Sequence, residues 1–194
     1  MKLIAISGGI GSGKSIVSRI VSVMGYPVYD CDSRASALMT ASDEVRQQVA
    51  EAFGVESYRE DGTLNRPYLS AKVFGNDEAL SRLNSIVHPA TASDMLQWAE
   101  IQQKNGVTMA FVETALLHTA HIDLLVDEVW HVTAPADTRV KRVMVRSGLT
   151  AQQVQNRMAA QAIEEEPVDG EQVIINDDVT AVLPQVMRLI INNE

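Results

Sequence analysis

The chain has 194 residues, of which 46% are hydrophobic and 21% charged, a composition that excludes a disordered chain and indicates one globular domain with insertions. A formal net charge of −9 argues against nucleic acid or an anionic membrane as a partner. The apolar stretch before Ser7 is too short for a signal peptide or a membrane anchor, and the single cysteine, Cys31, excludes an internal disulfide. We therefore expect a cytoplasmic protein that acts as a monomer.

The N-terminal region predicts a strand, a glycine-rich turn and a helix. The apolar run Leu3–Ile6 lies in a predicted strand over about residues 2–7. A helix is predicted after Ser15, with one apolar face formed by Ile16, Val17, Ile20, Val21 and Met24. Between them, residues 8–15 read GGIGSGKS, which matches the phosphate-loop pattern G-x-x-x-x-G-K-[ST] in its required context. The pattern predicts that the chain binds a nucleoside triphosphate, with Lys14 at the β- and γ-phosphates and Ser15 on Mg²⁺. The alternative is a glycine-rich turn without a ligand.

A pair of carboxylates follows the second predicted strand. Gly25 ends the first helix, Pro27-Val28-Tyr29 begin a short strand, and Asp30-Cys31-Asp32 come next. Ligands of open parallel sheets bind outside the carboxyl ends of the strands, and residues two apart on an extended segment point the same way. We therefore expect Asp32 to be the base or orienting group for an acceptor hydroxyl, with Asp30 assisting through Mg²⁺ or its waters. The structural alternative for Asp32 is a helix N-cap.

The remaining elements predict an α/β fold with three layers and a five-stranded parallel sheet. Residues 33–105 contain no convincing strand and divide into helices at Gly54, Asp61-Gly62, Gly75-Asn76 and His88-Pro89. Strands are predicted over residues 107–112, 128–133 and 173–175, and a closing helix over about 180–191. Strands separated by helices indicate right-handed parallel crossovers. The single P-loop domain then has a core of about residues 1–32, 106–134 and 171–194, with an acceptor-binding helical insertion over about 33–105.

Positive charge gathers in a predicted helical lid over about residues 135–166. Five of the 16 lysines and arginines lie here with no intervening acid: Arg139, Lys141, Arg142, Arg146 and Arg157. Pro135 is expected to begin a first helix that stops at Ser147-Gly148, and Thr150 to cap a second. The arginines at 139, 142 and 146 share one side of the first helix, so we expect them to face solvent until phosphates bind. The alternative is a solvated basic face paired with the glutamates at 164–166.

These motifs together resemble the dephospho-CoA kinase family of P-loop kinases. The resemblance rests on the GGIGSGKS loop, the D-x-D after the second strand, Leu83 to Pro89, and the arginine-rich helices that end at Gln161. It runs over essentially the whole chain and includes Ala134-Pro135 and Val173 to Asn176. Members of this family phosphorylate the ribose 3′-hydroxyl of dephospho-CoA with ATP, in the last step of coenzyme A synthesis. The resemblance therefore implies ATP, Mg²⁺ and dephospho-CoA as the partners of this chain.

Position by position, the resemblance also implies site residues. The ATP site would comprise Gly11, Ser12, Gly13, Lys14, Ser15, Ile16 and Arg142, with Asn176 near the adenine. The catalytic groups would be Asp32, Lys14, Arg142 and Arg146, and the acceptor would be held by Asp32, His88 and Arg157. His88 has an equally good structural interpretation, as a residue that ends a helix before Pro89.

Three positions depart from the family pattern. Many relatives have Thr at position 16, so Ile16 would contribute only its backbone N–H; Thr119 replaces a usual Glu; and Asp177-Asp178 stand where Gly is frequent. Shikimate kinase is the alternative kinase, but the insertion is too long and the glycine-triplet loop of that enzyme is absent. A small GTPase would need Asn-Lys-x-Asp and Asp-x-x-Gly motifs, which the sequence lacks. A non-catalytic ATP-binding regulatory protein remains the third alternative.

Overall fold

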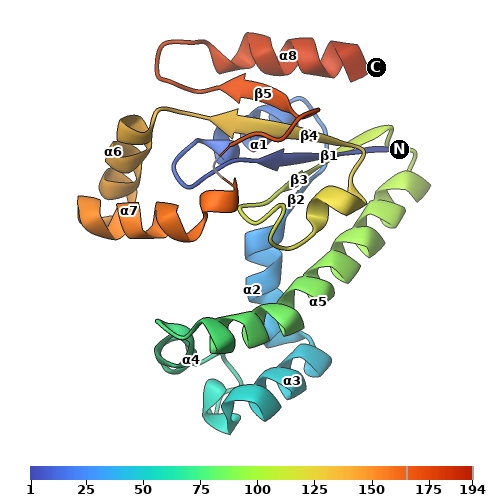
Figure 1. Cartoon of the computed structure of the whole chain (residues 1–194). Coiled ribbons are helices and arrows are strands. Elements are labelled where there is room, and N and C mark those ends of the chain that lie inside the picture. The colour runs from blue at the N-terminus through green and yellow to red at the C-terminus, as the bar shows by residue number, and fades with distance from the viewer. Residues whose placement is uncertain (165, 194) are drawn as a thin grey trace. The chain divides into compact units, whose positions relative to one another are not determined.

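The computed structural model describes residues 1–164 and 166–193, which divide into two compact units (Figure 1). The first unit contains Met1–Asp30 and the chain from Ala99 onward, and the second contains Cys31–Trp98. The second unit overlaps the helical insertion predicted over about residues 33–105, whose role in acceptor binding stays a prediction. No helix among the described residues has the length and apolar character needed to span a membrane.

The first unit is built on a parallel sheet of five strands. These are β1 (Lys2–Ser7), β2 (Val28–Asp30), β3 (Met109–Glu113), β4 (Glu128–Thr133) and β5 (Gln172–Ile175). Their order is β2-β3-β1-β4-β5, so β1 lies in the centre with β3 and β4 as parallel neighbours. The predicted strands, their parallel arrangement and the α/β fold class are confirmed. The carboxyl ends of all five strands meet at one edge of the sheet, where the loops after them gather.

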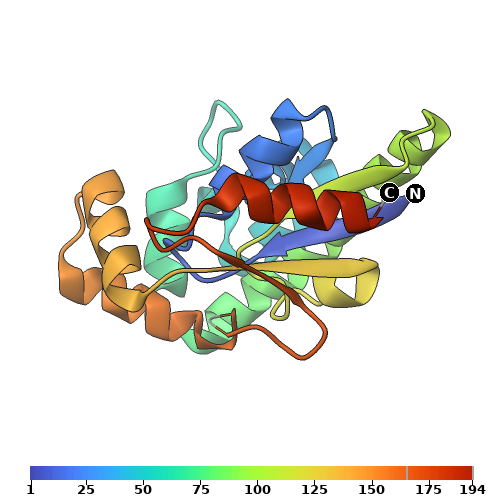
Figure 2. The same ribbon diagram turned by 90° about the horizontal axis from the view of Figure 1, so that it is seen from above.

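Helices α1 (Lys14–Val23) and α8 (Val182–Asn193) cover one face of this sheet, and Figure 2 shows α8 lying over the strands. Val17 and Val21 of α1 share a core with Val186 and Ile190 of α8 and with Trp130 of β4. The prediction that Ile16 and Met24 also belong to the buried face of α1 is wrong, because both side chains are exposed. The apolar stripe of α1 is therefore narrower than the sequence spacing indicates.

Two further helices follow β4. They are α6 (Ala136–Ser147) and α7 (Ala151–Ala160), and a short 3-10 turn, η3 (Ala162–Glu164), comes after them. Pro135 caps α6 rather than forming its first residue, while Gly148 ends α6 in a left-handed conformation as predicted. Thr150 forms a capping box with Gln153 at the start of α7, which confirms the predicted second helix. Another 3-10 turn, η2 (Ile122–Leu125), precedes β4.

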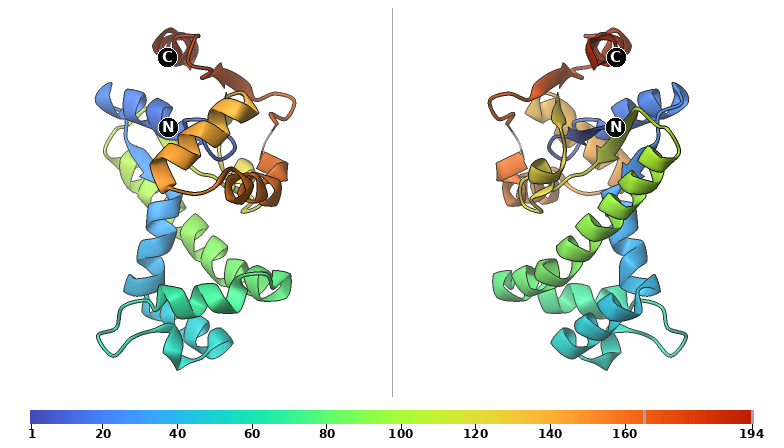
Figure 3. Two further views of the ribbon diagram at one scale, coloured as in Figure 1. Left: turned by 90° about the vertical axis from the view of Figure 1, so that its left-hand side faces the viewer. Right: turned by 90° about the vertical axis from the view of Figure 1, so that its right-hand side faces the viewer.

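The second unit is helical (Figure 3). It contains α2 (Cys31–Ala41), α3 (Asp43–Phe53), the 3-10 turn η1 (Val55–Ser57), α4 (Arg66–Val73) and most of α5 (Asp77–Lys104). Its core is formed by Val45, Val49, Phe53, Leu64 and Leu69. Ser42 caps α3 and Asn65 caps α4 through their side-chain oxygens. The expectation of helices without a strand is confirmed for these described residues; the only pairing is the isolated bridge between Tyr58 and Leu64.

The predicted helix break at His88-Pro89 is wrong, since α5 continues through Pro89. Proline removes one backbone donor and costs about 3 kcal/mol inside a helix. Val87 and Met95, on either side of the proline, are buried, and the Thr91 hydroxyl donates to the Val87 carbonyl at 2.9 Å. Tertiary burial on both sides therefore outweighs the local cost. The structural interpretation of His88 as a residue that ends a helix is therefore also wrong.

Candidate active site

The glycines of residues 8–15 form a tight turn between β1 and α1. Gly8 and Gly13 have φ angles of +133° and +98°, which side chains rarely adopt. A Cβ at Gly8 would lie 2.2 Å from the Val132 carbonyl oxygen, and one at Gly13 would lie 2.0 Å from Asn176 Nδ2. Both positions need glycine for conformation and for space. The backbone thus wraps closely at the N-terminus of α1, as a phosphate cradle requires.

Lys14 and Ser15 occupy the first positions of α1. Lys14 Nζ donates to the Gly8 carbonyl at 2.6 Å and lies 3.5 Å from the Gly9 carbonyl. The ammonium group therefore contacts the backbone of the glycine loop. The Ser15 side chain is exposed. The Ile16 N–H donates to the Gly13 carbonyl at 2.9 Å. The assignment of Ile16 to ATP binding stays a prediction, because a phosphate oxygen would have to replace the Gly13 carbonyl as the acceptor of its N–H.

Asp30 and Asp32 are placed differently from the way the sequence suggests. Asp30 is the exposed last residue of β2, opposite Glu113 of β3 at the carboxyl edge of the sheet. Asp32 is exposed and lies in the first turn of α2, which begins at Cys31. The argument from an extended segment is therefore wrong, because the extended backbone ends at Asp30 and Asp32 already belongs to a helix. The N-cap alternative also fails, because Asp32 is inside the helix.

The residues at the start of α6 are docked on the glycine loop. Arg139 is only 5% exposed, and its Nε donates to the Ile10 carbonyl at 2.9 Å. Arg142 donates to the carbonyls of Gly11 and Ser12, both at 3.3 Å. A Cβ at Gly11 would lie 2.8 Å from the Arg139 carbonyl oxygen, so the two backbones are nearly in contact. The backbone of α6 therefore packs directly against the loop.

Arg142 has further partners near the end of β5. It donates to the Asn176 carbonyl at 2.9 Å and pairs with the Asp178 carboxylate. Asn176 is 5% exposed, and its Nδ2 donates to the Ser12 carbonyl at 2.8 Å. Asn176, assigned to the adenine by resemblance, thus ties β5 to the loop. The expectation that the lid arginines face solvent with few partners is wrong for Arg139 and Arg142, whereas Arg146 and Arg157 are exposed.

Counting nearby charged side chains does not predict these contacts, because most of the acceptors are backbone carbonyls and Asp178 lies 36 positions away from Arg142. A glycine-rich loop that directs its N–H groups toward an anion leaves several carbonyls pointing the other way. Arginine, with five donors in a planar fork, is well suited to occupy them. The absence of nearby acids in the sequence therefore did not mean an absence of partners.

Glu164 was also missed. The sequence places it in a solvated glutamate run, but its side chain is only 1% exposed, and it accepts hydrogen bonds from the backbone N–H groups of His118 and Thr119. Glu165, in the same run, lies outside the described residues, and Glu166 is exposed. The one sequence signal in this loop is Thr119, which stands where the family usually has Glu.

A second polar group adjoins this loop. His118 lies 3.5 Å from Asp123 through Nδ1 and 3.4 Å from Glu171 through Nε2, and His131 Nδ1 lies 3.4 Å from Glu171. These residues come from the loop after β3, from η2, from β4 and from the position just before β5. The group does not include a predicted site residue.

The residues at the sheet edge fit Mg²⁺, although no cluster of three or more His, Cys, Asp or Glu suitable for a metal exists among the described residues. Mg²⁺ is usually held by one or two protein oxygens together with phosphates and water. The exposed Ser15 hydroxyl and the Asp30 carboxylate at the carboxyl edge are groups of that kind.

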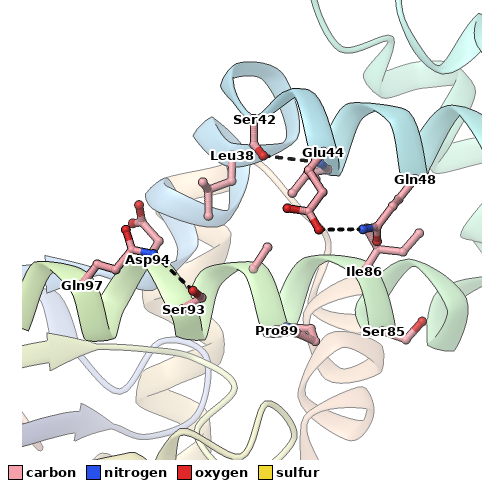
Figure 4. Close-up of a pocket in the computed structure, with 12 residues that line it drawn as sticks. Leu38, Ser42, Glu44, Gln48, Ser85, Ile86, Pro89, Ser93, Asp94 and Gln97 are labelled. Atoms are coloured by element: carbon pink, nitrogen blue, oxygen red, sulfur yellow. Dashed lines mark hydrogen bonds between the residues drawn. The ribbon is translucent and has the colours of Figure 1, made fainter.

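The second unit contains a cavity of about 400 Å³ between α2, α3 and α5 (Figure 4). Its wall combines apolar side chains with serine hydroxyls, glutamine amides and the carboxylates of Glu44 and Asp94. No lysine, arginine or histidine is among the described residues that line it, so it is poorly suited to phosphate. His88 is not one of the lining residues, although its neighbour Pro89 is. The structure does not bring His88 into this cavity.

A glycine loop that feeds a helix, beside a central parallel strand and under an arginine-bearing helix, defines a P-loop kinase. Solved structures agree. The crystal structure of TT1252 from Thermus thermophilus matches with a TM-score of 0.78 at 28% identity and covers 98% of this chain and 95% of that one. A dephospho-CoA kinase from Campylobacter jejuni has the same fold, with a TM-score of 0.71 at 22% identity over 99% of this chain and 97% of its own.

Sequence comparison narrows the class to one family. The family model for dephospho-CoA kinase matches residues 2–182. A dephospho-CoA kinase of Porphyromonas gingivalis is 37% identical over 192 residues, which cover 98% of this chain and 93% of the relative. One from Geobacter sulfurreducens is 37% identical over 181 residues, covering 93% and 91%. The chain belongs to the dephospho-CoA kinase family.

Proposed function

We propose that this chain transfers the γ-phosphoryl group of ATP to the ribose 3′-hydroxyl of dephospho-CoA and so produces coenzyme A and ADP. The observation that carries the proposal is the glycine loop with Lys14 and Ser15, in a chain whose family match covers residues 2–182. The acceptor oxygen forms a bond to the γ-phosphorus while the bond to the bridging β–γ oxygen breaks. Catalysis of this transfer rests mainly on positioning and on stabilising negative charge.

The loop and α1 hold the donor in this proposal. Backbone N–H groups between Gly11 and Ser15 surround the phosphates, and Lys14 moves from the loop carbonyls to the β- and γ-phosphates. Ser15 and Asp30 would hold Mg²⁺, which would supply charge neutralisation at those phosphates. Asn176 holds the loop backbone beside the adenine.

The acceptor is activated by Asp32 and held by the helical insertion. Asp32 accepts the proton of the 3′-hydroxyl or orients that hydroxyl for attack. His88 of α5 and Arg157 of α7 bind the acceptor, and the exposure of the Arg157 side chain leaves it available. Asp32 is suited to contact a substrate, because its carboxylate is exposed at the start of α2.

Arg142 and Arg146 stabilise charge on the transferring group in different ways. Arg142 must exchange its carbonyl and Asp178 contacts for phosphate oxygens, which carry more charge. Arg146 is exposed and reaches the phosphates when α6 and α7 close over them, which excludes water that would hydrolyse ATP. The mobile part of the lid is then the region beyond Arg142, because the start of α6 is packed on the loop.

We further propose that the protein is a cytoplasmic monomer that binds neither nucleic acid nor membranes. A net charge of −9 disfavours polyanionic partners, and the arginines that could attract anions are gathered at the glycine loop and the lid.

The test is a coupled ADP-release assay with dephospho-CoA, shikimate, nucleoside monophosphates and buffer as acceptors. We expect rapid, Mg²⁺-dependent release with dephospho-CoA, near-background release with the other three, and phosphorus NMR that places the new phosphate on the 3′-oxygen. Preference for another acceptor would replace the substrate assignment. Equal, slow release with all four would indicate a non-catalytic ATP-binding protein.

A further inference from the structure

The buried carboxylate of Glu164 accepts hydrogen bonds from His118 and Thr119. Its Oε1 accepts from the N–H of Thr119 at 2.9 Å, from the Thr119 hydroxyl at 3.0 Å and from the N–H of His118 at 3.1 Å. Its Oε2 lies 3.3 Å from the same His118 N–H. A carboxylate at 1% exposure needs such bonds to offset its lost hydration. The hydrogen bonds around Glu164 therefore favour the ionised carboxylate, which accepts all of them.

These bonds join two segments that are distant in the sequence. Glu164 ends η3, directly after α7, whereas Thr119 belongs to the loop that follows β3. In that loop, the His118 ring also lies 3.5 Å from Asp123 and 3.4 Å from Glu171. Glu164 therefore joins the end of the lid segment to the loop after β3.

The opposite end of the same segment is fastened to the glycine loop. Arg139 and Arg142 at the start of α6 donate to carbonyls of residues 10–12. The glycine loop follows β1 and the Thr119 loop follows β3, and these strands are neighbours in the sheet. The α6–α7 segment thus spans from one loop to the next, and the exposed Arg146 and Arg157 lie between its two attachments.

We infer that Glu164 is a positioning residue for phosphoryl transfer. Its carboxylate fixes the C-terminal end of the lid on the Thr119 loop, so that Arg146 and Arg157 close along one path over the phosphates. The inference rests on the proposed kinase function. Without this attachment the segment is held at one end only, closure becomes less complete, and water reaches the γ-phosphate more often.

The most informative variant is Glu164→Gln, which keeps the shape of the side chain. The amide oxygen can still accept the bonds made to Oε1, but the amide nitrogen that replaces Oε2 is a donor and faces the His118 N–H, which also donates. Glu166→Gln is the matched control, because it removes the same charge from an exposed side chain two residues away. Glu164→Asp keeps the charge on a shorter chain, so partial rescue is expected. Thr119→Val removes the hydroxyl from the other side of the contact.

For Glu164→Gln we expect kcat with dephospho-CoA to fall about tenfold, the scale of one lost charge-assisted hydrogen bond, with the ATP Kd within about twofold of wild type. The fraction of ATP hydrolysed without transfer should rise, and the amide hydrogens of His118 and Thr119 should exchange faster. Glu166→Gln should change none of these quantities, and Thr119→Val should change them in the same direction as Glu164→Gln.

Two results would overturn the inference. One is faster amide exchange at the Thr119 loop with unchanged kcat and hydrolysis, which would make Glu164 structural only. The other is an equal loss in Glu166→Gln, which would indicate a general charge effect. If Glu164→Gln does not fold, Thr119→Val supplies the same readouts. A wild-type protein that fails to phosphorylate dephospho-CoA would instead contradict the proposed function, and amide exchange would still report the attachment.

Discussion

Arg142 and Arg146 lie one helical turn apart, and their surroundings predict that replacing Arg142 lowers stability much more than replacing Arg146. Arg142 bonds three carbonyls, two of them at a long 3.3 Å, and pairs with Asp178, whereas Arg146 is exposed. A net hydrogen bond contributes about 0.5–1.5 kcal/mol, and a surface ion pair about 0–1 kcal/mol. Because the Arg142 side chain is 25% exposed and two bonds are long, we expect Arg142→Ala to cost about 2 kcal/mol.

At this chain length, 1 kcal/mol corresponds to a Tm change of about 2–4 °C, so Arg142→Ala should melt about 4–8 °C below wild type. Arg146→Ala should stay within about 2 °C, as surface substitutions do. Both variants should lower kcat/KM for ATP and dephospho-CoA by roughly a hundredfold or more, because each removes charge stabilisation from the transition state. Scanning calorimetry without ligand and steady-state ADP release measure the two effects separately.

Lys141→Ala is the control, since it also removes one positive charge but points about 100° away from Arg142 on the helix. It should retain activity and stability near wild type. An Arg142→Ala protein that melts like wild type would show that the carbonyl contacts are not formed in solution. Equal activity losses in Lys141→Ala and Arg146→Ala would refute specific arginine contacts and indicate a diffuse positive field.

Three further predictions address the loop, the acceptor and the sheet. Lys14→Met should lower kcat by roughly two to four orders of magnitude with the fold intact, and retention of more than about a tenth of the activity would exclude its role at the phosphates. Asp32→Asn should lower kcat while ATP affinity stays near wild type, as judged by titration calorimetry; unchanged turnover would remove Asp32 from the chemistry. Burial raises the pKa of Glu128, but hydrogen bonds from Lys2, Trp130 and Asn193 outweigh it and hold the pKa below 4.5. The ionised carboxylate of Glu128 therefore stabilises the folded protein above that pH, and this stabilisation is lost as the pH falls. In urea unfolding, the difference in free energy of unfolding between wild type and Glu128→Gln should therefore decrease from pH 6 to pH 3.

Local patterns were sufficient to predict the sheet and the glycine loop. The strand β4 and the capping box at Thr150 follow from apolar alternation and from the chemistry of side-chain oxygens at helix starts. The loop is recognisable because its glycines adopt backbone angles and close approaches that other residues cannot. These features depend on neighbours in the sequence.

The contacts that could not be predicted depend on distant residues. Pro89 remains inside α5 because tertiary burial of Val87 and Met95 outweighs the local penalty. Arg139 bonds the carbonyl of a residue 129 positions away, which no count of nearby charges reveals. In the sequence, Glu164 is one member of an acidic run, and nothing near it indicates its hydrogen bond to Thr119, 45 positions away. Pairing with backbone groups leaves almost no trace in side-chain patterns.

The position of β1 has a consequence for synthesis on the ribosome. β1 is made first, but its partners β3 and β4 begin at Met109 and Glu128, roughly 5–25 s later at about 5–20 residues per second. During that interval, both edges of a strongly apolar strand lack their final neighbours and are open to misassociation. The helical unit at 31–98 is one continuous segment that can form meanwhile. Slowing translation before residue 109 should therefore increase the dependence of the nascent chain on chaperones.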